Sequence, residues 1–130
     1  MNAEADSALA RKLLIKPAMS VLVLDSQPGY EDALQPLPEG ARISQNAAGQ
    51  HDVVQLFPRT KSDVDRLAPV ALQALKPGGV LWASFPKGSS KIQTDLTRDR
   101  GWDAFRDRGW RIVTVVSLDD TWSAGRFRPE

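Results

Sequence analysis

Short apolar runs that alternate with helical patterns constrain this chain most, because few architectures accommodate such alternation. Three runs read as buried strands: MSVLVLD (19–25), DVVQLFP (52–58) and VLWASF (80–85). They are rich in β-branched and aromatic residues and too short for typical helices. Helical patterns separate them. The order favours right-handed βαβ units and a mainly parallel sheet.

The remaining segments predict helices, turns and a closing hairpin. Apolar spacing predicts helices over 5–15, 60–76 and 95–108, with a single turn of helix over 30–34. Pro69 lies inside the second pattern, where an interior proline costs about 3 kcal/mol, so we expect a kink or two short helices. Segment 41–44 is a weak strand candidate. WRIVTVVSLDD and TWSAGRFRP predict two strands joined at Asp119 and Asp120.

These elements predict a three-layer α/β sandwich, with a mainly parallel twisted sheet and a C-terminal antiparallel hairpin. A chain of 130 residues suits one domain, 1–130. It contains no cysteine, which excludes disulfides, thiolate metal ligands and a cysteine nucleophile, and we expect no metal site. No run approaches the roughly 20 apolar residues of a membrane span. We therefore expect a cytoplasmic protein that does not bind membranes.

Polar residues follow each predicted strand at its carboxyl end. LDSQPG follows the first strand, FPRT the second and PKGSSK (86–91) the third. In open α/β sheets, ligands bind outside the carboxyl ends of the strands, where the strand order reverses. The three loops therefore define one candidate rim for a binding site.

The loop PKGSSK has the composition of an anion-accepting turn. Its small residues leave backbone N–H groups accessible, its lysines add charge, and an arginine from the neighbouring strand end can lean in. The candidate anion-binding residues are Arg59, Lys87, Gly88, Ser89, Ser90 and Lys91. The alternative is a flexible polar connector.

The order strand–loop–DVVQLF–helix–LKPGG–VLWASF–helix–GWRIVTVVSL–hairpin resembles class I S-adenosylmethionine-dependent methyltransferases, which have a Rossmann-like fold. The similarity spans about residues 10–128, with LKPGG before an apolar strand as its most specific motif. It implies that a cofactor would meet the loop after the first strand at Asp25, Ser26 and Gly29. PLPEG, PKGSS, QTDLTRDRGWD and DDTWSAGRFRP also resemble a small uncharacterised bacterial family of compact methyltransferase-like proteins. That resemblance implies the fold and no known activity.

Two departures from the methyltransferase pattern argue against cofactor binding. The loop LDSQPGY has one glycine where the family has a Gly-x-Gly-rich turn that lets the backbone approach the cofactor. The strand ARISQNA ends in Gln45 and Asn46, where the family has an acid that bonds the ribose hydroxyls. We therefore expect no cofactor, with S-adenosylmethionine as the alternative.

Other candidate residues each have a structural and a functional interpretation. His51 is a turn residue, or else a general base or a ligand. Asp119, Asp120 and Trp122 form a hairpin turn or a site with an aromatic wall. The carboxylates that repeat every four residues from 95 to 107 line a solvated helix face or do acid–base or metal chemistry.

The sequence favours a domain that binds a ligand or partner at the strand-end rim without catalysis. Seven Lys or Arg and four Asp between residues 87 and 111 suit a small anionic or phosphorylated ligand, or a protein partner. Nucleic acid is disfavoured, because the net charge is only +1. The alternatives are a compact S-adenosylmethionine-dependent methyltransferase and a structural or regulatory interaction module.

Overall fold

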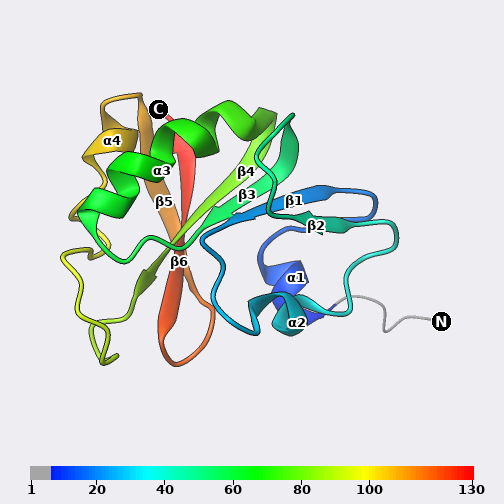
Figure 1. Ribbon diagram of the computed structural model, residues 1–130, viewed down its shortest axis with the longest axis horizontal. Helices are drawn as coiled ribbons and strands as arrows, with labels where there is room; N and C mark the ends of the chain where they lie inside the picture. Colours follow the sequence, from blue (N-terminus) through cyan, green and yellow to red (C-terminus); the bar gives the residue numbers. More distant parts are fainter. Residues whose placement is uncertain (1–6) are drawn as a thin grey trace.

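The computed structural model describes residues 7–130, which form a six-stranded mixed sheet with short helices on both faces (Figure 1). The strands are β1 (Ser20–Leu24), β2 (Arg42–Ser44), β3 (His51–Leu56), β4 (Leu75–Pro86), β5 (Trp110–Ser117) and β6 (Trp122–Pro129). The helices are α1 (Ala8–Lys12), α2 (Tyr30–Leu34), α3 (Lys61–Ala74) and α4 (Asp103–Arg106).

The strand order is β2-β1-β3-β4-β6-β5. β1 pairs in parallel with β2 and β3, and β3 pairs in parallel with β4. β6 runs antiparallel to both β4 and β5. The chain therefore passes from β1 to one side, then returns to the other side of β1 at β3. This reversal lies where the sequence predicted the binding rim.

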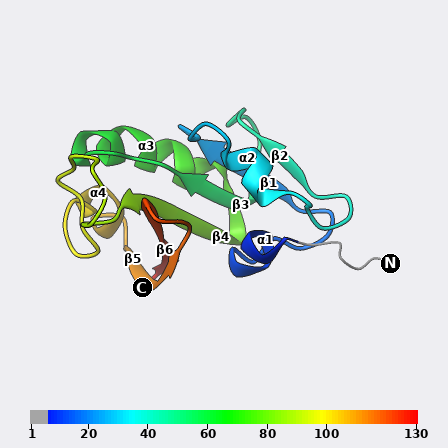
Figure 2. The same cartoon turned by 90° about the horizontal axis from the view of Figure 1, so that it is seen from below.

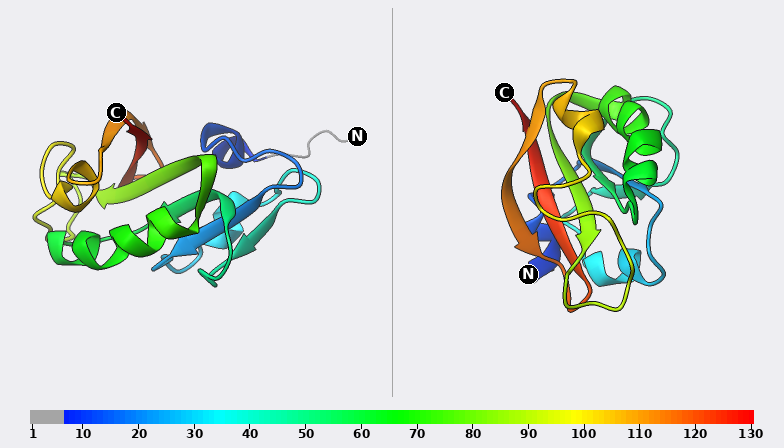
Figure 3. Two further views of the ribbon diagram at one scale, coloured as in Figure 1. Left: turned by 90° about the horizontal axis from the view of Figure 1, so that it is seen from above. Right: turned by 90° about the vertical axis from the view of Figure 1, so that its left-hand side faces the viewer.

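Helices cover both faces of the sheet and produce three layers. Figures 2 and 3 show α3 and α1 on opposite sides. On the α3 face, a cluster around Leu22, Leu56 and Leu81 packs against α3 and α4. On the other face, Val21, Val53 and their neighbours pack against α1 and α2. The alternation follows from the strand period of two, and it confirms the predicted sandwich and hairpin.

The predicted helix boundaries need correction at three places. α1 is described only from Ala8 and ends at Lys12, and positions 5 and 6 of the predicted helix lie outside the described residues. α3 runs continuously through Pro69 instead of dividing there. The predicted strand VLWASF begins earlier, because KPGG belongs to β4, with a register shift opposite the segment from His51 to Val53.

The helix predicted over 95–108 is wrong for most of its length, because only Asp103–Arg106 is helical. Local bonds to Thr97 hold the preceding segment in turns: its hydroxyl accepts from the Asp99 N–H at 3.2 Å, and its carbonyl accepts from the Trp102 indole at 2.7 Å. Gly101 has φ +96°. Side-chain bonds of this kind compete with helix formation, so the carboxylates spaced every four residues do not share one helix face.

The centre of the sheet is fully buried. Trp82 is 2% exposed, and its indole N–H donates to the carbonyl of Leu13 at 2.9 Å, which ties β4 to the end of α1. Ile112 and Val115 are only partly buried, because β5 is the edge strand. Within residues 7–130, no helix is long and apolar enough to cross a membrane.

Candidate functional site

The loop after β1 turns sharply at two residues with positive φ. Asp25 has φ 55°, and its carboxylate accepts a bond from Arg66 of α3 at 2.8 Å. Gly29 has φ 79°, and a Cβ built on it would meet nothing within 4 Å. The single glycine therefore supplies both the left-handed backbone and open space beside the chain.

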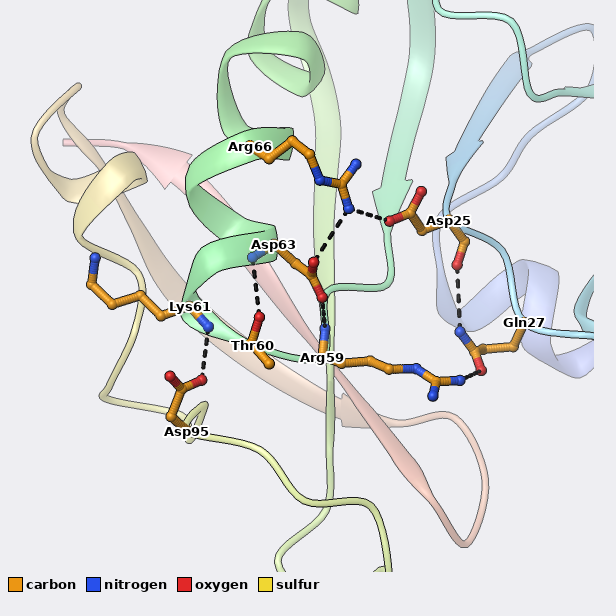
Figure 4. Close-up of polar contacts among 8 residues, drawn as sticks. All are labelled: Asp25, Gln27, Arg59, Thr60, Lys61, Asp63, Arg66 and Asp95. Atoms are coloured by element: carbon orange, nitrogen blue, oxygen red, sulfur yellow. Dashed lines mark hydrogen bonds and ion pairs between the residues drawn. The ribbon is translucent and has the colours of Figure 1, made fainter.

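Side chains from the loop after β3 and from α3 tie this rim together (Figure 4). The Arg59 guanidinium donates to the Gln27 side-chain oxygen at 2.9 Å. The Arg59 backbone N–H donates to Asp63 at 3.0 Å, and this bond, helped by Arg66, lowers the pKa of Asp63. The loops after β1 and β3 are thus held by direct bonds across the point where the strand order reverses.

The amino end of α3 binds a carboxylate that comes from another segment of the chain. The side chain of Thr60 caps the helix by accepting from the Asp63 N–H at 3.2 Å, and the Lys61 N–H donates to Asp95 at 2.7 Å. Asp95 comes from the long segment after β4 (Figure 4). This carboxylate therefore anchors that segment to α3, a role that its place in the predicted helix did not suggest.

A hollow of about 310 Å³ lies between the loop after β1 and the end of β2. Its lining includes Ser26, Gly29, Glu31 and Gln45. Glu31, on α2, accepts a bond from the Gln45 amide at 2.5 Å. The structure therefore brings a carboxylate to the end of β2 from another element, although β2 itself has none. The sequence did not point to Glu31, because the acid that bonds the ribose was expected at the end of β2 itself.

The predicted anion-binding residues lie at the rim, but they do not converge as expected. Arg59 bonds Gln27, whereas the Lys87 ammonium donates to the Ser117 hydroxyl at 2.7 Å. Gly88, Ser89 and Lys91 are exposed. The Ser90 hydroxyl oxygen is buried and has no hydrogen-bond partner among the described residues.

A larger hollow of about 820 Å³ lies beside this loop, at the end of β4. Its apolar lining includes Phe85, Ile92 and Leu96, and its cations are Lys87 and Arg98. Its size lies within the range of small-molecule sites. The first residues of the loop PKGSSK, Pro86, Lys87 and Gly88, therefore line this hollow.

Beneath the rim runs a buried chain of hydrogen bonds. The Tyr30 hydroxyl donates to the Gln55 side-chain oxygen, and the Gln55 amide donates to the Ser84 hydroxyl at 3.0 Å. All three residues are buried. Burial raises the pKa of the Tyr30 hydroxyl far above its ordinary value. These hydrogen bonds link α2, β3 and β4 directly under the loops.

His51 lies away from the rim, at the first residue of β3. It is 6% exposed, and its Nδ1 lies 2.6 Å from the Ser20 hydroxyl. Because parallel strands share one direction, the start of β3 is at the amino edge of the sheet. The structure therefore separates His51 from the candidate rim by the length of β3.

The comparisons with known proteins rest on solved structures, since no family model and no curated protein matches the chain. The DhpI complex with S-adenosylhomocysteine has a TM-score of 0.62 at 15% identity, covering 95% of this chain and 82% of that one. The pyocyanin biosynthetic protein PhzM has a TM-score of 0.65 at 11% identity, covering 94% and 53%. An RNA methyltransferase from Salinibacter ruber, in complex with S-adenosylhomocysteine, has a TM-score of 0.50 at 15% identity, covering 94% and 88%.

These similarities show the fold: the chain has a class I methyltransferase-like α/β fold. They also correct the expectation that no cofactor is needed, which is wrong, because structures with this fold hold S-adenosylhomocysteine. That expectation rested on two absences: the glycines missing from the loop after β1 and the acid missing from the end of β2. Gly29 with its open space and Glu31 beside Gln45 weaken both premises.

Proposed function

We propose that the chain binds S-adenosylmethionine at the carboxyl ends of β1 and β2 and acts as a compact methyltransferase. One observation carries the proposal: Glu31, Gly29 and the loop after β1 line one hollow at the carboxyl ends of β1 and β2, next to the point between β1 and β3 where the strand order reverses. Ligands of open α/β sheets bind at this place. The solved structures of this fold that hold S-adenosylhomocysteine support the same ligand class.

The residues of this hollow fit a nucleoside with a free ribose. A carboxylate has about four acceptor positions, so Glu31 can accept from ribose hydroxyls while it keeps its bond from Gln45. Gly29 leaves room for close approach of a ligand to the backbone. Asp25 is held by Arg66, so its role is to fix the turn. When bound, S-adenosylmethionine supplies a methyl group on a sulfonium sulfur.

Calorimetry with S-adenosylhomocysteine tests the proposal directly. We expect a dissociation constant of about 10 μM or tighter for the unmodified chain. Glu31→Gln should weaken binding by about ten- to a hundredfold, since a hydrogen bond to a charged group contributes about 1.5–3 kcal/mol.

Glu39→Gln is the matched control, because it removes the same charge from an exposed glutamate that does not line the hollow. It should leave the affinity unchanged. A dissociation constant weaker than about 1 mM for the unmodified chain would refute cofactor binding. Equal losses in the two variants would refute the role of Glu31.

A second candidate function is the binding of a small anionic ligand at PKGSSK. The observation that favours it is the hollow of about 820 Å³, in which Lys87 and Arg98 lie beside an apolar floor and the carboxylate of Asp95 is bonded to the Lys61 N–H. Outside this lining but in the same loop, the buried Ser90 hydroxyl has no partner among residues 7–130. A phosphate group bound by Lys87 and Arg98 would gain charge-assisted hydrogen bonds, which are roughly twice as strong as neutral ones.

Thermal unfolding with and without inorganic phosphate tests this candidate. Phosphate should raise the unfolding temperature, and Lys87→Ala with Lys91→Ala should abolish the increase. The control is Lys16→Ala with Lys76→Ala, two exposed lysines elsewhere on the surface. If the first pair keeps the phosphate effect, the loop is only a wall of the hollow.

A further inference from the structure

An aromatic hollow of about 340 Å³ lies between α2, the end of β3 and the start of β6. Tyr30, Phe57 and Trp122 form its aromatic wall. The Tyr30 and Phe57 rings meet edge-on with centroids 4.7 Å apart, and those of Phe57 and Trp122 with centroids 5.2 Å apart. All three are buried, so packing fixes the wall before any ligand arrives.

Asp119 is the one charged residue that lines this hollow in the described part of the chain. Its Oδ1 accepts from the backbone N–H groups of Thr121 and Trp122, each at 2.8 Å. No hydrogen bond to its other oxygen comes from residues 7–130. The β5–β6 turn therefore holds a carboxylate in a fixed position with one oxygen available.

The aromatic wall presents rings and no free hydroxyl. Tyr30 donates its hydroxyl to Gln55 beneath the wall, away from bulk solvent. Desolvation by burial raises the pKa of Tyr30 most, and the negative charge of Asp119 raises it further. The second effect is a sign that the Asp119 charge reaches the Tyr30 ring.

We propose that this aromatic hollow binds an organic cation: a compact apolar ring system that carries a protonated or quaternary nitrogen. Aromatic rings attract cations through their quadrupole, at about 0.5–1 kcal/mol for exposed sites and about 2 when desolvated. The Asp119 carboxylate adds the opposite charge at the rim, where exposure limits its contribution. An anion would meet that charge without a compensating cation among the described lining residues.

The aromatic hollow shares lining residues with each of the two hollows described above. It shares Gln27, Pro28 and Gly29 with the proposed nucleoside hollow, and Ile92 with the hollow of about 820 Å³. The cation site stands without the proposed methyl transfer. Where both hold, the cation lies beside the cofactor and is the recognition group of the methyl acceptor.

The test compares benzylamine, a cation at pH 7, with benzyl alcohol, which is neutral and nearly the same size. NMR titration follows the amide signals of residues that line the hollow. We expect benzylamine to bind about fivefold tighter. Asp119→Asn should reduce that preference to the part that the aromatic rings supply, and it should leave benzyl alcohol unaffected, because the new amide oxygen still accepts both turn bonds.

Asp120→Asn is the matched control, because it removes the adjacent carboxylate, which does not line the hollow. The proposal is overturned if benzyl alcohol binds as well as benzylamine, if neither shifts these signals, or if Asp120→Asn gives the same loss. A last arm adds saturating S-adenosylhomocysteine. Retained benzylamine binding supports a separate site, and displacement would assign the hollow to the cofactor and overturn it.

Discussion

Removing the hydroxyl of Tyr30 should destabilise the fold, because it breaks the buried chain of hydrogen bonds under the rim. In Tyr30→Phe, the Gln55 side-chain oxygen loses its donor at a site that is 1% exposed. Leaving a buried acceptor unsatisfied costs about 1–3 kcal/mol. With an m-value of about 2 kcal/mol/M, the urea midpoint should fall by about 0.5–1.5 M.

A triple variant separates the lost hydrogen bond from lost packing. Tyr30→Phe with Gln55→Met and Ser84→Ala replaces the whole chain by apolar groups, which can be nearly neutral. We expect the triple variant to recover at least about half of the lost free energy of unfolding. If it is less stable than Tyr30→Phe, the hydrogen-bond chain is not the cause.

The same residue predicts how stability depends on high pH. The pKa of Tyr30 is raised in the folded state by desolvation, so the folded chain keeps its proton above pH about 10, where the unfolded chain loses it. The unfolded state then binds fewer protons, and stability falls as pH rises, by up to about 1.4 kcal/mol per pH unit. Tyr30 is the only tyrosine in the chain, and the extra slope should vanish in Tyr30→Phe.

Three further predictions concern the scaffold. Gly79→Ala should destabilise by about 1–3 kcal/mol, because its Cβ would lie 2.9 Å from backbone oxygens; Gly88→Ala, with nothing within 4 Å, should be nearly neutral by the same urea assay. Asp63, whose pKa is lowered first by the Arg59 N–H, contributes stability above pH about 4 that is lost in acid. Asp63→Asn should flatten that acid limb, and an unchanged limb would refute it. Trp82→Phe should cost about 1–3 kcal/mol by leaving a buried carbonyl unpaired, and an unchanged urea midpoint would contradict this.

The sequence predicted the sheet better than the helices around it. Apolar strands such as β1 and β3 are buried on both faces, so their patterns leave little choice of structure. The segment 95–102 has helical spacing, but Thr97 and Gly101 hold turns there. Propensity over a few residues cannot foresee such local competition.

The candidate rim was also predictable, but its chemistry was only partly so. Strand direction places Asp25, Arg59 and Lys87 at the carboxyl edge without further information. The bond between Gln45 and Glu31 joins residues of different elements, and the opening beside Gly29 depends on its backbone conformation. Those features arise from tertiary packing, so the sequence alone suggested that the cofactor site was missing.

The position of β6 between β4 and β5 has a consequence for the order of assembly during synthesis. A ribosome completes β4 and β5 before β6, yet β4 has no partner on that side until β6 arrives. Until then β4 exposes an apolar, unpaired edge that can join another chain. The nascent protein therefore passes through an interval in which aggregation competes with insertion of a single strand.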